Sequence, residues 1–372
     1  MSRRLPALDA LRGLILVLMA LDHASLLLAR VHPFEMWNQA LPVYGSTSWF
    51  FTRWLTHLCA PGFFLLMGAG MALLESSRRA RGWDAARVRR FFFLRGGALI
   101  AISYVFEVAP MMLMQNTGQG AMPLSPVVLG ALVCLGLSMI LAGALMVLAT
   151  PWWFLLGALC LLAPNLLLPQ MSAGAAGHNL ALLLIAPGQS ALVASGYPLL
   201  PWFGICALGV GFGRLLRRDA ARTIRAAFPA GLALILVFAS IRAGGGFGNL
   251  RLAEGGTWIS WLTVVKYPPS LAFTSLMLGL DLLLLFLLEL AQRSLPALMQ
   301  VLNVYGQAPL FFYVTHFYVF GSLSMTAFRQ HPAPQWLLYP CWLFGVALLY
   351  YPCRRFRDFK LRQPAESLWR LL

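Results

Sequence analysis

Charged residues are scarce in this chain of 372 residues, and acidic residues are the scarcest of them. Asp, Glu, Lys and Arg together make up 11% of the sequence, against about 25% in soluble globular proteins. Hydrophobic residues make up 60% and the mean hydropathy is +0.74. A soluble core of this size cannot hide so much apolar surface. The composition therefore excludes an ordinary soluble domain and indicates an integral membrane protein with one membrane domain.

Several motifs of known chemistry are also missing. The chain contains no HExxH helix, no Walker loop and no GxSxG elbow. None of its cysteines has metal-ligand spacing such as CxxC, so we expect no metal cofactor and interpret the cysteines as small apolar helix residues. They are Cys59, Cys134, Cys160, Cys206, Cys341 and Cys353. No cleavable signal peptide is indicated, because the apolar run after Arg4 is too long and contains Asp22 and His23.

Basic residues greatly outnumber acidic ones, with 28 Lys and Arg against 12 Asp and Glu and a net charge of +16. Such an excess can attract nucleic acid. Here, however, most of the basic residues lie in short segments between apolar runs, which is the pattern of a membrane protein with its basic loops in the cytoplasm. We therefore expect the chain to contact a lipid bilayer and to bind no nucleic acid.

Apolar runs of roughly 20 residues, the length that crosses a bilayer, occur ten times. They are 9–30, 51–75, 92–114, 124–148, 152–169, 198–216, 225–243, 269–290, 298–325 and 335–353. If these runs cross the membrane alternately, most basic residues fall on the side of the N-terminus. The sequence thus predicts an all-α polytopic membrane protein, a single domain over residues 1–372, with about ten transmembrane helices and both termini in the cytoplasm.

Glycine-rich clusters occur inside two of these runs. The first is Gly68-Ala69-Gly70 and the second is Gly209-Val210-Gly211-Phe212-Gly213. The second is similar to a nucleotide-binding glycine motif, but it lies in an apolar run without the strand and helix that such a motif needs. We interpret both clusters as sites of close helix packing.

The first apolar run contains three ionisable residues, Arg12, Asp22 and His23. An ionisable residue at membrane depth is costly unless it faces protein or water, so it marks a candidate functional site. Histidine can accept a proton near neutral pH, and a neighbouring carboxylate strengthens it as a base. Adjacent helix positions point about 100° apart, so we expect His23 to face a cavity and Asp22 to face another helix. The alternative is a structural hydrogen bond at the end of this helix.

Arg53 and His57, four residues apart, share one face of the second run and lie on the same side of the membrane as His23. A cavity between His23 and His57 is one interpretation, and an interfacial belt is the other. His316 lies well inside the run 298–325, as a packing or a catalytic residue. Lys266, just before the eighth run, either binds an anion or extends its charge to the membrane surface.

The remaining ionisable residues give weaker signals. Glu107 and Asp281 are isolated acids inside apolar runs that could pair with Arg12 or a histidine. The other three histidines fall in loops and are expected at the surface; they are His32, His178 and His331.

Several segments together resemble a known family. In order they are Leu8-Asp9-Ala10-Leu11-Arg12-Gly13 with Leu21-Asp22-His23, Phe51-Thr52-Arg53-Trp54-Leu55-Thr56-His57-Leu58-Cys59-Ala60-Pro61, Tyr197-Pro198-Leu199-Leu200-Pro201-Trp202-Phe203-Gly204, Lys266-Tyr267-Pro268-Pro269-Ser270, Pro309-Leu310-Phe311-Phe312-Tyr313 with His316, and Tyr351-Pro352-Cys353-Arg354. The chain resembles the heparan-alpha-glucosaminide N-acetyltransferase catalytic-domain-like family of bacterial membrane proteins. The resemblance extends over almost the whole chain.

The resemblance implies a transmembrane acyltransferase of the bacterial plasma (inner) membrane. Such enzymes transfer an acetyl group from cytosolic acetyl-CoA to an acceptor across the membrane, classically the amine of a terminal glucosamine. Arg12 and His23 match the positions of an inner Arg and an outer His on the first helix of the wider superfamily. The lysosomal branch has asparagine in place of His23, and its catalytic histidine aligns near Thr47. The base is therefore expected to be His23 or His57.

We accordingly expect acyl transfer to an amino or hydroxyl group of a saccharide-like acceptor, with acetyl-CoA as donor. His23 is the first candidate for general base, assisted by Asp22, and His57 is the second. Arg12 and Arg95 are candidates for binding the CoA phosphates. The candidates for acceptor contacts are Arg53, Lys266, Trp202 and His316. The alternative is a proton-coupled transporter of an acidic or sugar-like solute. The acceptor's identity and a homodimer both stay open.

Overall fold

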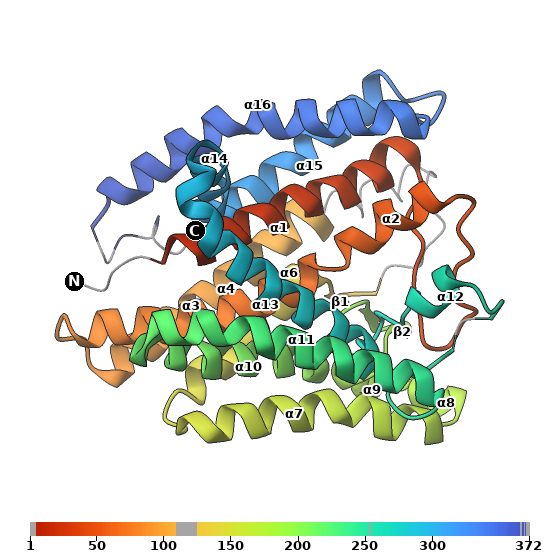
Figure 1. Ribbon diagram of the computed structural model, residues 1–372, viewed down its shortest axis with the longest axis horizontal. Helices are drawn as coiled ribbons and strands as arrows, with labels where there is room; N and C mark the ends of the chain where they lie inside the picture. Colours follow the sequence, from red (N-terminus) through yellow and green to blue (C-terminus); the bar gives the residue numbers. More distant parts are fainter. Residues whose placement is uncertain (1–4, 109–124, 253, 365–366, 368, 370–372) are drawn as a thin grey trace.

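The structure is a computed structural model that describes residues 5–108, 125–252, 254–364, 367 and 369, and most of these residues are helical (Figure 1). Most of the long helices follow the longest axis of the molecule. The first helix, α1 (Pro6–Ala24), begins with a proline. Proline is tolerated there because the N–H groups of a helix's first turn have no acceptor within the helix. The helix α1 continues into a π-helical turn, Ser25–Ala29.

Eight helical segments in the described part of the chain are long and apolar enough to cross a membrane. They are α1 with Ser25–Ala29; α2 (Thr47–Thr56) with α3 (Cys59–Arg79); α4 (Ala85–Ser103) with the π-helical turn Tyr104–Val108; α7 (Thr150–Leu167) with the 3-10 turn Leu168–Gln170; α10 (Leu199–Arg218); α11 (Ala220–Gly244); α13 (Leu271–Ser294); and α16 (Gln335–Arg362). They coincide with eight of the ten predicted runs. Positions 109–114 of the run 92–114 lie outside the described residues.

The other two predicted runs differ from one unbroken membrane-length helix. The run 124–148, whose first residue is not described, contains a short strand and a single helix, the 14-residue α6 (Ala131–Ala144). The run 298–325 is divided into α14 (Pro296–Gln307) and α15 (Pro309–Thr326). Pro309 lacks the N–H that a continuous helix needs there, so the chain turns at Ala308 and a new helix begins. The prediction of one helix over 298–325 is wrong.

The second run is also interrupted, between α2 and α3. Pro61 cannot donate a hydrogen bond to the carbonyl of His57, four residues earlier, which weakens the helix at this point. The break leaves Arg53 on the short helix α2 and His57 at its C-terminal cap, just before α3 begins.

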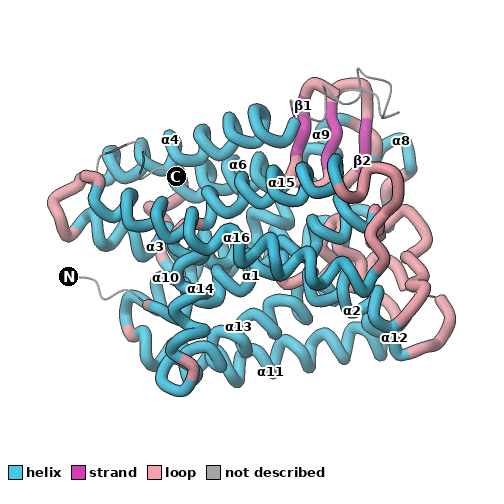
Figure 2. The backbone as a smooth tube through the Cα atoms, turned by 90° about the horizontal axis from the view of Figure 1, so that it is seen from above, coloured by secondary structure: helices cyan, strands magenta, loops and turns pink. Residues whose placement is uncertain are grey.

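A small sheet adds to the predicted all-α fold. β1 (Val127–Leu129) pairs in parallel with β3 (Val193–Ser195), and β2 (Gly188–Gln189) pairs with β3 in the antiparallel sense. Figure 2 shows these strands at one end of the helix bundle. The short helices α8 (Ala173–Ala176), α9 (Asn179–Leu184) and α12 (Trp258–Leu262) lie at the same end. The predicted loops on this side thus form a structured cover.

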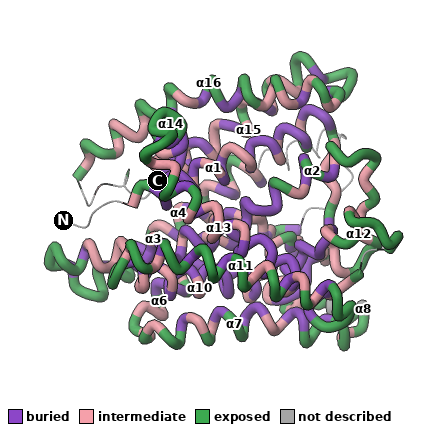
Figure 3. The backbone as a smooth tube through the Cα atoms, viewed as in Figure 1, coloured by how far each residue is buried: buried purple, intermediate pink, exposed green. Residues whose placement is uncertain are grey.

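The buried residues form two large apolar clusters. One joins α3, α4, α6, α7, α10 and α13, and the other joins α1 with α14, α15 and α16. Glycines allow the closest contacts: a side chain at Gly13 would strike the backbone of Leu302 in α14, and one at Gly209 would strike that of Leu65 in α3. The glycine cluster of α10 is therefore a helix-packing surface, as the sequence predicts. Figure 3 shows the buried backbone concentrated in the middle of the bundle.

The basic segments gather at the opposite end from the sheet. α1 begins there, α16 ends there, and the turns from α3 to α4 and from α10 to α11 lie there as well (Figure 1). Adjacent runs thus cross the molecule in alternating directions. This arrangement agrees with the distribution of basic residues on which the predicted topology rests.

Candidate active site

A cavity of about 770 Å³ lies where the two apolar clusters meet. One face of α1 lines its whole length, at positions Leu5, Leu8, Asp9, Arg12, Leu16, Met19, Asp22 and His23. These positions recur every three or four residues, which is the spacing of one helix face. An α-helix rises 1.5 Å per residue, so Arg12 and His23 are separated by about 16 Å along the axis. The cavity therefore connects two distant polar regions.

We call the region near the start of α1 the basic end. Six cationic side chains line it: Arg12, Arg78, Arg81, Arg95, Arg357 and Lys360. Arg12 donates to Asp9 at 2.9 Å and to the carbonyl of Gly306 at 3.1 Å. The Nε atom of Arg95 is buried and hydrogen-bonds none of the described residues. So many like charges around one carboxylate, Asp9, create a site that attracts an anion.

We call the region near the end of α1 the histidine end. Its polar lining residues come from five different parts of the chain and are Asp22, His23, Thr56, Tyr197, Lys266 and Tyr313. The fold thus brings together the end of α1, the end of α2, the start of α10, the loop before α13 and α15. Histidine, carboxylate, ammonium and phenol groups face one space here, a combination that is suited to proton transfer.

His23 forms a close pair with His316 of α15. Its Nδ1 atom lies 2.6 Å from Nε2 of His316, and the two rings stack with centroids 4.9 Å apart. Nδ1 of His316 lies 3.1 Å from the carbonyl oxygen of Phe312, which can only accept a hydrogen bond. With both rings neutral, His316 therefore donates to Phe312 and accepts from His23. This chain leaves the lone pair of His23 on Nε2, and no described residue hydrogen-bonds that atom.

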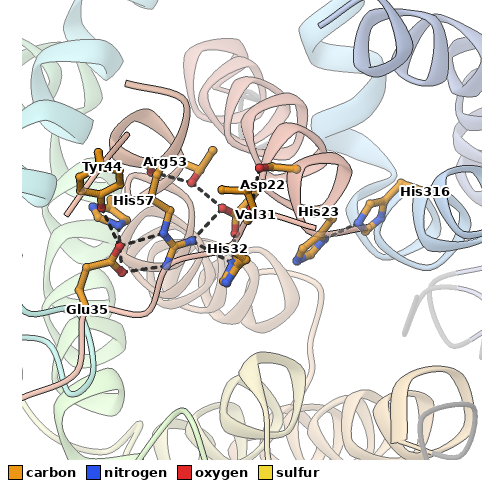
Figure 4. A network of polar contacts seen from close by, with 11 residues as sticks. Asp22, His23, Val31, His32, Glu35, Tyr44, Arg53, His57 and His316 are labelled. Carbon is orange, nitrogen blue, oxygen red and sulfur yellow. Dashed lines mark hydrogen bonds and ion pairs between the residues drawn. The ribbon is translucent and has the colours of Figure 1, made fainter. Parts of the chain in front are cut away.

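Arg53 is the centre of a separate ionic network (Figure 4). Its guanidinium donates to both carboxylate oxygens of Glu35, at 3.0 and 2.8 Å, and to Asp22 at 2.8 Å. Thr56 donates to Asp22 at 2.7 Å, and Nε2 of His32 lies 3.1 Å from Asp22 and 2.9 Å from Arg53. One cation thus joins two carboxylates, and the bidentate contact with Glu35 fixes its orientation.

Glu35 is fully buried in this network and lies in the loop outside the membrane-length helices. Burial by itself raises the pKa of Glu35, but the charges of Arg53 and His57 outweigh it and hold this pKa well below its usual value. Burial and the negative charge of Glu35 raise the pKa of Tyr44, whose hydroxyl donates to Glu35 at 3.1 Å. At neutral pH Glu35 is therefore ionised and Tyr44 is neutral.

The predicted site residues divide into two groups. Arg12, Asp22, His23, Arg95 and Lys266 line the cavity. The second group does not line the cavity and consists of Arg53, His57, Trp202 and His316. Asp22 turns toward α2, as expected, and its hydrogen bonds among the described residues go to Arg53, Thr56 and His32 rather than to His23. His316, rather than Asp22, is thus the hydrogen-bond partner of His23.

His57 and Trp202 are core residues in this structure. His57 is 1% exposed, with Nε2 at 3.3 Å from Glu35 and its ring against Phe273. Trp202 is fully buried between Phe64 and Tyr197. Neither reaches the cavity, so the expected contact of Trp202 with an acceptor and the expected opening of His57 to a cavity do not agree with the structure.

Sequence reasoning missed Glu35 and misplaced His32. His32 is part of the Arg53 network rather than a surface residue. Both belong to the irregular segment between α1 and α2, where no helical or strand periodicity tells which side chains point inward. The only signal that could have identified Glu35 is the rarity of acidic residues in this chain. A carboxylate close to an apolar run needs a cation as its partner, which points to a nearby basic residue.

The two isolated acids have different surroundings. Glu107 accepts hydrogen bonds from Ser103 and from Tyr313, the residue whose ring meets that of His23 edge-on. Asp281 is fully buried in α13, and neither carboxylate oxygen hydrogen-bonds any described residue. Among the described residues neither acid pairs with Arg12 or a histidine.

Comparison with known proteins gives one finding. The family model described as "Heparan-alpha-glucosaminide N-acetyltransferase, catalytic" matches residues 4–242. No curated protein matches the chain. The matched region extends from α1 to α11 and includes Arg12, His23 and Arg53, whereas Lys266 and His316 follow it in the sequence.

Proposed function

Because the chain belongs to the family of heparan-alpha-glucosaminide N-acetyltransferase catalytic domains, we propose that it transfers an acetyl group from acetyl-CoA to an amino group of a saccharide-like acceptor. A hydroxyl group is the second type of acceptor that the same chemistry can serve. The donor enters at the basic end and the acceptor enters at the histidine end. The observation that carries the proposal is the single cavity that joins the arginine cluster to the free Nε2 of His23.

The basic end suits the donor because CoA is a polyanion. Several phosphate groups can each accept charge-assisted hydrogen bonds from arginine, which is stronger than pairing with a neutral donor. The cavity volume of about 770 Å³ lies within the range of small-molecule sites. The basic loops at this end favour a cytoplasmic location by the positive-inside rule, and CoA is available in the cytoplasm. The histidine end then faces the outer side.

At the histidine end, His23 acts as the general base. Its Nε2 takes the proton from the acceptor nitrogen as that nitrogen attacks the thioester carbonyl and forms the new C–N bond. The C–S bond then breaks, and the imidazolium returns the proton to the departing CoA thiolate. The net reaction conserves every proton and needs no metal or redox partner. A base placed in this way typically contributes about 10²–10⁴-fold to the rate.

His316 acts as a positioning residue in this scheme. It holds the proton of His23 on Nδ1, so that Nε2 faces the acceptor, in the same way that a carboxylate orients the histidine of a catalytic triad. Asp22 acts indirectly, since its carboxylate is bound by Arg53 and holds α2 against the end of α1. His57 has no direct role, because it does not line the cavity.

A transfer assay tests the proposal. Purified protein is mixed with acetyl-CoA labelled in the acetyl group and with glucosamine, and the label on the sugar is measured for the wild type, for His23→Ala and for His331→Ala. His331 is an exposed loop residue and serves as the matched control. We expect the label to move with the wild type and the control, and the rate to fall at least 10²-fold for His23→Ala.

The alternative, a proton-coupled transporter, uses the same buried ionisable residues. If no label moves and CoA does not bind, while solute flux into vesicles responds to a pH gradient, the transporter is the correct function. Label retained on the protein in the absence of acceptor would contradict direct transfer and indicate an acyl-enzyme.

A further inference from the structure

Lys266 is the one charged residue of the histidine end that forms no ion pair or side-chain hydrogen bond in the described part of the chain. It lies in the loop between α12 and α13, its residue is 3% exposed, and it lines the cavity. No ion pair or hydrogen bond joins its Nζ atom to a described residue, and its nearest aromatic contact is the ring of Tyr267 at 5.1 Å. A buried ammonium without a direct hydrogen-bonding or ion-pairing partner is expensive.

The backbone around Lys266 is firmly fixed. The N–H groups of Lys266 and Tyr267 both donate to the carbonyl oxygen of Glu35, at 3.0 and 3.1 Å. The carbonyl of Tyr267 accepts from the N–H of Trp37 at 3.1 Å. The lysine is thus anchored to the same segment that carries the carboxylate bound by Arg53. These backbone hydrogen bonds hold the loop in place, so the position of Lys266 at the cavity wall is set by the fold.

The carboxylates near Lys266 are already engaged. Glu35 is bound by both nitrogens of one edge of Arg53, and Asp22 is bound by Arg53, Thr56 and His32. The charges of the whole histidine end still balance, since two carboxylates stand against Arg53 and Lys266. The ammonium that completes this balance faces the cavity, where a ligand can approach it directly.

An aromatic side chain lies in the same part of the cavity wall. Tyr197 lines the cavity, and its ring meets Tyr267 at 5.7 Å and Trp202 at 4.9 Å. Aromatic rings present an apolar face and a polar hydroxyl, which suits the mixed surface of a sugar. Cation and aromatic surface together describe a subsite at the histidine end of the cavity, which His23 also lines.

We propose that Lys266 binds an anionic substituent of the acceptor, so that the preferred acceptor is an acidic amino sugar rather than a neutral one. The substituent is a carboxylate, a sulfate or a phosphate, all of which pair with an ammonium. This inference rests on the proposed function, because it names the acceptor class of the same site. It makes Lys266 a specificity-determining residue that contacts the substrate.

A series of acceptors that differ only at carbon 6 tests the proposal. The series is glucosamine, glucosamine 6-phosphate, glucosamine 6-sulfate and 2-amino-2-deoxyglucuronic acid. For the wild type we expect a KM about 10-fold or more lower for at least one acidic acceptor than for glucosamine. In Lys266→Gln this preference disappears, because the KM of the acidic acceptors rises toward that of glucosamine. Lys266→Arg keeps part of the preference, and the exposed-loop variant Arg329→Gln keeps all of it.

Two results would overturn the inference. One is a wild type without any preference among the four acceptors. The other is an equal loss with all four in Lys266→Gln, which would mean that the lysine only balances the charge of the Arg53 network. If glucosamine is acetylated but the preference is absent, the proposed function stands and this inference fails.

A binding measurement separates the two proposals further and serves if Lys266→Gln does not fold. Glucose 6-phosphate lacks the amine, so it cannot be acetylated. We expect it to raise the melting temperature of the detergent-solubilised wild type more than glucose does. The same shift is kept in Lys266→Arg and lost in Lys266→Gln. An equal shift with glucose and glucose 6-phosphate in the wild type would refute the anion site even if no acceptor reacts.

Discussion

The two ends of the cavity differ in how their charged residues are arranged and paired. At the basic end, six cations from α1, α3, α4, α16 and the turn after α3 surround one carboxylate. At the histidine end, Arg53 is paired with two carboxylates. Two cavity-lining groups there have no hydrogen bond or ion pair with the described residues, namely Nε2 of His23 and the ammonium of Lys266. The first end is built to attract an anion by charge. The second is built to hold a few groups in fixed positions.

This difference predicts how each end tolerates change. A cation removed from the basic end leaves five others, so affinity for the donor falls gradually. A residue removed from the histidine end leaves buried partners unsatisfied, so stability or rate falls abruptly.

The largest effect is expected for Arg53→Met. The change leaves Glu35 and Asp22 buried without their cation, and breaking a buried pair in this way costs about 3–5 kcal/mol. Thermal unfolding in detergent should show a clearly lowered melting temperature. Arg30→Met is the matched control, because Arg30 is exposed and, among the described residues, its side chain donates only to the backbone carbonyls of Phe328 and Arg329. Equal stability of the two variants would show that the network does not hold α2 in place.

The next effect is expected for His316→Phe, which keeps a ring in the same space but removes the acceptor for Nδ1 of His23. His23 can then carry its proton on either nitrogen, so we expect kcat to fall about 10²-fold, with the KM of both substrates unchanged. The pH profile of kcat should shift as well, which a purely structural loss would not produce. Unchanged kcat, or a loss confined to KM, would exclude His316 as a positioning residue.

The smallest effect is expected for Arg95→Gln at the basic end. Its charge is one of six, so we expect the KM for acetyl-CoA to rise about 10-fold while kcat is kept. The difference from wild type should shrink as salt is added, because salt screens partly exposed charges. Arg90→Gln, an exposed residue of the same helix outside the cavity wall, is the control. A loss of kcat in place of KM would place Arg95 near the reacting atoms instead.

The sequence predicted the helices well because apolar runs of membrane length leave few alternatives. The same reasoning failed at Pro309, where one proline divides a run into α14 and α15 and turns the chain. It also missed the sheet formed by 127–129 and 188–195, because strands of two or three residues give no periodic signal.

The site was predicted in part for a similar reason. Arg12 and His23 stand out because they are ionisable within an apolar run, and both line the cavity. The partner of His23 could not be predicted, because Asp22 is adjacent in sequence while His316 lies 293 residues away and meets it only in the folded bundle. Glu35 and His32 lie in an irregular segment, where the position of a residue in the sequence does not indicate whether its side chain points inward.

The central claim is that one cavity joins a donor on the basic side to an acceptor on the histidine side. Its most direct test is label transfer in proteoliposomes that contain the protein in one orientation, with labelled acetyl-CoA supplied at the basic face and glucosamine 6-phosphate at the other. The account predicts acetylated sugar in this arrangement and none when both substrates are present only at the histidine face. Transfer when both substrates are confined to the histidine face would contradict it.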